Sequence, residues 1–182
     1  MAKLVSKVYG DALFEEALEK QKVDALFEEV KSLQTIFATN QDFAGLLDNP
    51  KIAKEEKAGI ITEVFGGRVS EALMGFLAVI VEKGRQKEIN AICDYFISTV
   101  KEYKRIGVAH VTSAVELKEE QKAQLLNKLL GTTSYQEFEM DYHVEPSIIG
   151  GLVIRIGDRV VDSSIKTQIH ELRRSLLKLQ IS

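Results

Sequence analysis

One stretch constrains the fold of this chain more than any other: residues 147–158, with the sequence SIIGGLVIRIGD. Its second half alternates apolar residues with others, which is the period of a β-strand; the apolar positions are Leu152, Ile154 and Ile156. Gly157-Asp158 then gives a two-residue hairpin signal, and Arg159–Asp162 is expected to form the return strand. The glycine pair Gly150-Gly151 indicates a bulge or a close approach between backbone segments.

A helix is expected directly after this hairpin. Either Ser163 or Ser164 can serve as its N-cap. Its apolar residues are spaced four, three, four and three positions apart: Ile165, Ile169, Leu172, Leu176 and Leu179. A narrow seam with this spacing is typical of a helix that packs against another helix. The basic residues Arg173, Arg174 and Lys178 are most simply explained as solvated side chains near a helix C-terminus, where the helix dipole favours them.

The composition limits the classes of protein to consider. The chain has 182 residues, 45% of them hydrophobic, which allows one or two folded domains with a core. A net charge of −3 gives no general attraction to nucleic acid or anionic lipid. The single cysteine, Cys93, excludes an internal disulfide and fits a reducing compartment. Residues 1–7 contain no apolar signal core, so neither secretion nor a cleaved presequence is expected.

The first 105 residues predict an antiparallel six-helix bundle. No strand pattern competes there, and Asn49-Pro50 is interpreted as the N-cap and first residue of the fourth helix. The inward stripe of the first helix is predicted to be Val5, Val8, Tyr9, Ala12, Leu13 and Ala17, and that of the sixth Ile89, Ile92, Cys93, Phe96, Val100 and Tyr103. The fifth helix contains the longest apolar run, Ala72–Val81, which is shorter than the ~20 residues that span a bilayer.

That fifth helix is apolar on more than one face. Its predicted inward stripe is Leu73, Phe76, Leu77 and Ile80, but Met74, Ala78, Val79 and Val81 are apolar as well. A helix of this kind either lies at the centre of a bundle or borders a groove for a partner's amphipathic helix. The sequence is compatible with both interpretations.

Residues 106–182 predict a small α/β unit with the order β-α-β-β-β-α. Alternation marks a strand from Ala109 to Val115, a helix follows over Lys118–Leu130 with Gly131 as its stop, and Phe138–Val144 is a second strand. The apolar residues of this helix include Ala123, Leu126 and Leu130. The fold class is therefore mainly α, a six-helix bundle over residues 1–105 followed by an α/β domain over residues 106–182.

Few groups of residues in the sequence suggest a catalytic or ligand-binding site. Asp141 and His143 have possible metal-ligand spacing, but the neighbouring glutamates make a solvated strand face the ordinary explanation, and no catalytic, cofactor or metal site is expected. Cys93 lies among apolar helix residues and is expected to be core. The glycines around Gly150 match neither a dinucleotide fingerprint nor a P-loop. Nucleic acid binding is disfavoured because the strand Leu152–Ile156 carries no aromatic residue.

Three segments together resemble the delta subunit family of F-type ATP synthases, which includes the mitochondrial oligomycin-sensitivity-conferring protein. They are the stretch 147–158 with Asp162–Lys166, the N-terminal Val8–Phe14, and Phe76–Arg85. The resemblance covers nearly the whole chain. It implies a non-catalytic stator subunit that links the catalytic head to the peripheral stalk, so that rotor torque drives ATP synthesis.

The resemblance also implies two partner sites. One is a groove between the first and fifth helices for the N-terminal helix of an alpha subunit, lined by Tyr9, Ala12, Leu13, Phe76, Val79 and Ile80. The other binds the C-terminal region of the b subunit through Gly150, Gly151, Ile165, Ile169, Leu172 and Leu176. It further implies a bacterial protein that is peripheral to the cytoplasmic face of the cell membrane, without insertion, and monomeric when isolated. The alternative function is an unrelated module for a helical partner, or a regulatory homodimer formed through the terminal seam.

Overall fold

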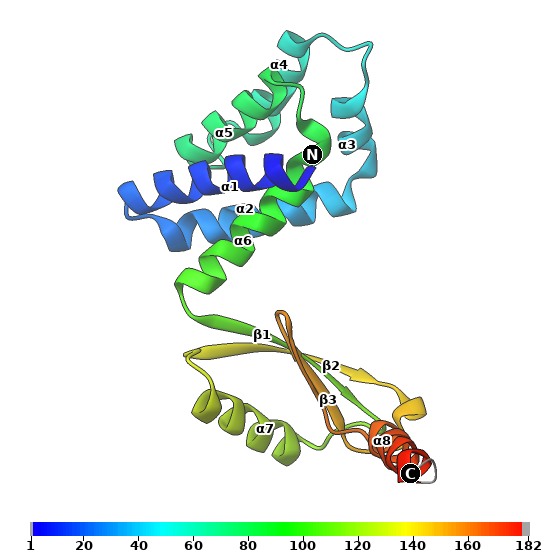
Figure 1. Cartoon of the computed structure of the whole chain (residues 1–182). Coiled ribbons are helices and arrows are strands. Elements are labelled where there is room, and N and C mark those ends of the chain that lie inside the picture. Colours follow the sequence, from blue (N-terminus) through cyan, green and yellow to red (C-terminus); the bar gives the residue numbers. More distant parts are fainter. Residues whose placement is uncertain (1, 180–182) are drawn as a thin grey trace. The chain divides into compact units, whose positions relative to one another are not determined.

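The structure is a computed structural model that describes residues 2–179. The chain folds into two compact units, residues 1–101 (unit 1) and residues 102–182 (unit 2). Unit 1 is helical, and unit 2 combines helices with a four-stranded sheet (Figure 1). The predicted fold class, mainly α with a small α/β domain, is confirmed.

Unit 1 consists of helices joined by short connections. The helices are α1 (Ala2–Glu19), α2 (Val23–Thr39), α3 (Gln41–Asp48), α4 (Lys54–Phe65), α5 (Glu71–Glu82) and α6 (Ile89–Tyr103), with a 3-10 turn η1 (Gln86–Glu88). α5 contacts α1, α2 and α4 and buries both Phe76 and Val81, so it is a central helix. Ser70 caps it by accepting a hydrogen bond from the Leu73 amide, and Glu29 of α2 accepts bonds from the Ser70 amide (3.0 Å) and hydroxyl (2.7 Å).

The predicted start of the fourth helix at Asn49-Pro50 is wrong. α4 begins at Lys54, with Ala53 as its N-cap. The Asn49 side chain instead accepts a hydrogen bond from the Lys51 amide at 3.0 Å, and its carbonyl accepts one from the Ile52 amide at 3.4 Å. Asn-Pro therefore starts a turn here, because the asparagine bonds to the backbone two residues ahead instead of capping a helix.

The predicted inward stripe of α1 is also partly wrong. Val8 is 58% exposed, whereas Ser6 and Gly10 are buried beside Leu13. Gly10 faces the ring of Tyr95 on α6, and a Cβ added there would lie 3.2 Å from Tyr95 Cε1 and closer still to Cδ1. The close approach of Tyr95 requires a small residue at position 10, so hydrophobicity alone selects the wrong face. On α6 the predicted stripe holds except at its end, where the Tyr103 side chain is exposed.

Unit 2 has the predicted order β-α-β-β-β-α. Its elements are β1 (Ile106–Ser113), α7 (Glu119–Thr132), β2 (Glu137–Val144), the 3-10 turn η2 (Pro146–Ile148), β3 (Leu152–Ile156), β4 (Arg159–Asp162) and α8 (Ile165–Leu179). The sheet order is β2-β1-β3-β4. β1 and β2 are parallel and joined through α7, whereas β3 pairs antiparallel with both β1 and β4. Ile156 pairs with Arg159, which confirms the two-residue Gly157-Asp158 turn.

The core of unit 2 lies between α7 and one face of the sheet. Its buried residues are Ala109, Val111, Leu125, Leu129 and Phe138. On α7, Leu125 and Leu129 supply the buried side chains, whereas Ala123 is exposed and Leu126 and Leu130 are half-buried. Two further details are wrong. The helix continues through Gly131 to Thr132, and β1 ends at Ser113, which leaves Val115 exposed.

Candidate partner-binding surfaces

The glycine pair forms a tight joint between the start of β3 and the start of α8. Gly151 has φ +77°, and a Cβ added there would lie 3.0 Å from the Ser163 carbonyl carbon and closer still to its oxygen. The Ile165 amide donates a hydrogen bond to the Gly150 carbonyl at 2.9 Å. The expected close approach of backbone segments is confirmed, because only a residue without a side chain fits between these two segments.

The first turn of α8 is held by a network of side-chain hydrogen bonds. Ser164 is buried, and its hydroxyl accepts a bond from the Thr167 amide at 3.2 Å, so Ser164 is the cap. Asp162 accepts bonds from the Ser164 amide at 2.8 Å and from the Thr167 hydroxyl at 2.7 Å. The hydrogen bonds from Ser164, followed by that from Thr167, lower the pKa of the Asp162 carboxyl below its ordinary value. This network fixes where α8 begins.

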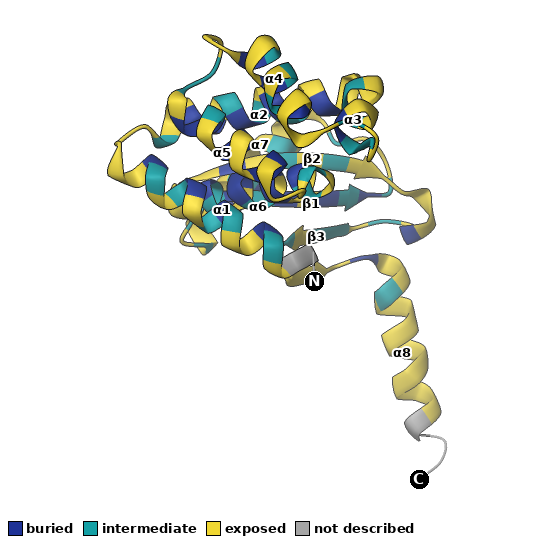
Figure 2. Ribbon diagram, turned by 90° about the horizontal axis from the view of Figure 1, so that it is seen from above, coloured by how far each residue is buried: buried dark blue, intermediate teal, exposed yellow. Residues whose placement is uncertain are grey.

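Beyond its first turn, α8 leaves its side chains uncovered by the described part of its unit. Figure 2 shows the helix coloured as exposed over nearly its whole length, and no side chain from 165 to 177 is buried. The seam residues Ile165, Ile169, Leu172 and Leu176 are 41%, 54%, 62% and 56% exposed. The side chain of Leu179 lies outside the described residues. Because a solvated apolar seam is unfavourable, this helix has the form of half of a helix–helix interface.

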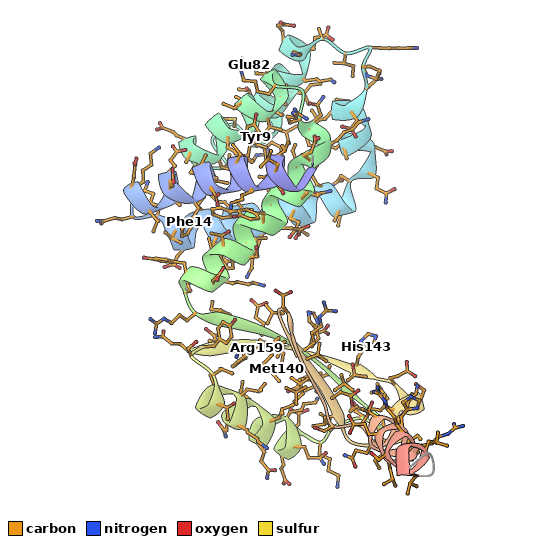
Figure 3. All side chains as sticks on the ribbon, in the orientation of Figure 1. Tyr9, Phe14, Glu82, Met140, His143 and Arg159 are labelled. Atoms are coloured by element: carbon orange, nitrogen blue, oxygen red, sulfur yellow. The ribbon has the colours of Figure 1, made fainter. Side chains whose placement is uncertain are left out.

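The six residues predicted on the first and fifth helices divide into two groups. Leu13, Phe76 and Ile80 are buried in the core of unit 1. Tyr9, labelled in Figure 3, is half-buried, while Ala12 and Val79 are exposed. α1 and α5 contact each other, so the residues that reach the surface belong to neighbouring helices.

Sequence reasoning missed part of the apolar surface on α1. Leu4 and Val8 are 68% and 58% exposed, and with the exposed Ala12 they recur at every fourth position along the helix. The spacing is visible in the sequence, but hydrophobicity alone places Val8 in the core. α1 thus carries two apolar faces, one buried in the bundle and one facing solvent.

The candidate chemical groups do not form a reactive site. His110 Nδ1 lies 2.9 Å from Asp141 Oδ2 across β1 and β2, and both side chains are exposed. His143, labelled in Figure 3, is exposed two residues further along β2. Within residues 2–179 no group of three or more His, Cys, Asp or Glu side chains could hold a metal ion. Burial raises the pKa of the Cys93 thiol to about 12, which keeps it protonated and unreactive.

The described residues also contain no helix that is long and apolar enough to cross a membrane. The prominent surfaces are instead apolar helix faces, one in each unit. Such faces are suited to the amphipathic helices of other proteins. The fold and these surfaces have the form of an adaptor protein.

Comparison with known proteins identifies the family. Residues 5–176 match the family described as "ATP synthase delta (OSCP) subunit". The chain is 53% identical to ATP synthase subunit delta of Lachnoclostridium phytofermentans over 181 residues, covering all of both chains. It is 34% identical to the subunit of Alkaliphilus oremlandii over the full length of both chains, and 33% identical to that of Desulforudis audaxviator over 97% of each. The chain belongs to the ATP synthase delta (OSCP) subunit family.

A solved structure agrees in fold. A chain of the Toxoplasma gondii mitochondrial ATP synthase hexamer superposes with a TM-score of 0.75 at 17% identity, covering 94% of this chain and 97% of that one. Family membership makes this chain a non-catalytic peripheral-stalk subunit of the F-type ATP synthase, a membrane-associated complex. Its partners are therefore other subunits of that complex.

Proposed function

We propose that the chain joins the catalytic head of the ATP synthase to its stalk through the two surfaces described above. Unit 1 binds the N-terminal helix of an alpha subunit, and α8 binds the C-terminal region of the b subunit. The complex would then lie with this chain on the cytoplasmic face of a bacterial membrane. The observation that carries the proposal is α8: its first turn is fixed by hydrogen bonds, while its seam is bare.

In unit 1, the residues of α1 and α5 that reach the surface would provide the contact. Ala12 and Val79 would touch the partner helix directly, with Tyr9 at the edge. Leu13, Phe76 and Ile80 would not touch the partner; they would support the site by packing the two helices against the core. Burial of apolar area contributes roughly 25 cal/mol per Å² before the cost of association is subtracted.

In unit 2, the roles also differ between residues. Ile165, Ile169, Leu172 and Leu176 would contact the b subunit, because they form the exposed seam. Gly150 and Gly151 would act indirectly, since they position the first turn of α8. Firm binding at both ends allows the chain to resist rotation of the head, so that rotor torque acts on catalytic sites in other subunits.

The α8 contact can be tested with a purified C-terminal fragment of the b subunit and the full chain. Leu172→Asp should weaken binding by at least about tenfold, because it places a charge in the seam. His170→Asp is the matched control, as it changes the same helix outside the seam and should leave the affinity within about twofold. Equal affinities for the two variants would refute the α8 contact.

The unit 1 contact can be tested with a synthetic peptide of the alpha-subunit N-terminus. Binding followed by NMR should shift the signals of Tyr9 and should be lost in Val79→Asp. Thr35→Asp on α2 supplies a control, because that residue is exposed on a different helix. If the peptide binds wild type and Val79→Asp alike, the α1–α5 site is wrong.

Light scattering of the isolated chain distinguishes the alternative function. The proposal expects a monomer at micromolar concentration. A regulatory homodimer formed through α8 would instead give a dimer that Leu172→Asp dissociates. Purification of the native complex adds a direct check, because the chain should co-purify with the ATPase activity.

A further inference from the structure

An apolar groove of about 530 Å³ lies in unit 2 beside the start of α8. It is formed by α7, the connection from β1 to α7, and the connection from η2 to β3. Val115 and Ile149 line it and are 70% and 62% exposed. Ile149 has φ +70°, a strained conformation for a β-branched residue, and such strain tends to occur where chains bind ligands.

The groove is continuous with the seam of α8. Gly150 lines the groove, and a Cβ added to Gly150 would lie 2.8 Å from Ile165 Cδ1. Ile165 is the first residue of the seam, so it borders the groove through Gly150. A single helical partner lying along the seam would therefore reach the groove with one of its ends.

The charges along this path are unusual for a chain with net charge −3. The described residues that line the groove include Lys128 but no acidic side chain. On α8, a heptad with Ile165, Ile169, Leu172 and Leu176 in the seam places Lys166 and Arg173 along one edge and Gln168 and Ser175 along the other. The single acidic residue of α8, Glu171, lies on neither edge.

We infer that the partner of α8 is an amphipathic helix whose own seam is flanked by acidic side chains, and that this helix extends from α8 into the groove. This rests on the proposed function, in which the partner is the b subunit, and it specifies the chemistry of the b-subunit segment. Lys166 and Arg173 would face the residues that flank the partner's seam, whether the partner helix runs parallel or antiparallel to α8. Two copies of α8 would not complement each other in this way. Antiparallel pairing would place Lys166 of one copy opposite Arg173 of the other, so that like charges would face each other.

The test uses the full chain and two synthetic coiled-coil peptides. Both have the same leucine and isoleucine seam, and they differ only in carrying glutamate or lysine at all flanking positions. The glutamate peptide should bind about tenfold more tightly at low salt, and the difference should shrink in ~1 M salt. The double variant Lys166→Glu/Arg173→Glu should reverse the preference.

Two controls make the result specific. The double variant His170→Glu/Arg174→Glu changes charge on α8 away from both edges and should keep the preference for the glutamate peptide. Val115→Asp should weaken the glutamate peptide several-fold, because it removes an apolar contact from the groove and adds a negative charge there. Equal binding of the two peptides by wild type, or the same reversal in the control variant, overturns the acidic partner. An unchanged affinity in Val115→Asp overturns the assignment of the groove.

The b-subunit fragment separates this inference from the proposed function. If Leu172→Asp abolishes binding of the fragment but Lys166→Glu/Arg173→Glu changes neither its affinity nor its salt dependence, only the acidic edge is refuted. If the fragment does not bind wild type at all, the proposed function fails, whatever the synthetic peptides do.

Discussion

Replacing Gly151 by alanine should destabilise unit 2 more than the same change at the other glycines compared below. The positive φ at Gly151 costs an alanine about 1 kcal/mol. The added Cβ would also overlap the backbone of Ser163 and Ser164, which is not the flexible end of a side chain and cannot move aside. Relief of such overpacking costs about 1–3 kcal/mol. The expected loss is therefore about 2–4 kcal/mol in the free energy of unfolding of unit 2.

Two other glycines provide matched controls. Gly157 has φ +55° but nothing near its position, so Gly157→Ala should cost only about 1 kcal/mol. Gly131 lies inside α7 with open space around it, and Gly131→Ala should stabilise the unit by about 0.5–1 kcal/mol. The three changes add the same methyl group, so their order isolates the backbone contact at Gly151.

The assay is urea unfolding followed by NMR, with amide signals of β1 and β3 reporting unit 2 and those of α6 reporting unit 1. With a slope of about 1 kcal/mol per M urea, the Gly151→Ala midpoint of unit 2 should fall by about 2–4 M. If the unit does not fold at all, Gly150→Ala supplies a milder change, because its Cβ would meet only the end of the Ile165 side chain. A Gly151→Ala protein as stable as Gly157→Ala would refute the close-approach explanation.

Three further predictions concern single residues. Gly10→Ala should lower the stability of unit 1 by about 1–3 kcal/mol in urea unfolding, because the Tyr95 ring must move; unchanged stability would contradict the tight α1–α6 crossing. Alkylation of Cys93 at pH 8 should be at least about 100-fold slower in the native protein than in urea, and equal rates would contradict its burial and raised pKa. An NMR titration should give Asp162 a pKa below 3.8 that rises in Ser164→Ala. Since the hydrogen bonds favour the ionised form, their contribution to α8 is present above the ordinary pKa and is lost as the pH falls through the lowered value.

The parts of the fold that were predicted well are those in which turn, capping and alternation patterns in the sequence agree with the packing in the structure. The Gly157-Asp158 turn and a serine cap at Ser163 or Ser164 follow from short-range chemistry; the structure has the turn and uses Ser164 as the cap. The alternation along β2 likewise separates buried Phe138 from its exposed neighbours. Errors arose where distant contacts decide the outcome. Gly10 is buried against Tyr95 of α6, and nothing near Gly10 in the sequence indicates this contact.

The candidate sites were predictable to different degrees. The sequence pattern of the α8 seam agrees with the exposed apolar residues up to Leu176, because the described part of its own unit leaves the helix uncovered beyond the first turn. The solvent-facing residues of α1 and α5 were harder to predict from the sequence. There the residues facing the core and those facing solvent are both apolar, as Leu13 and Val8 illustrate, and hydrophobicity cannot separate them. Burial in the folded bundle makes that distinction.

The bare seam of α8 has a consequence for copies of the chain that find no partner. A helix of 15 residues with little tertiary packing is only marginally stable in water, so α8 opens far more often than the bundle or the sheet. Its opening exposes the backbone to proteases in addition to the seam, which is already bare in the folded helix, while the rest of the chain stays folded. In the proposed assembly a bound partner would cover the seam and hold the helix, so that the state of α8 would report whether a copy has been incorporated.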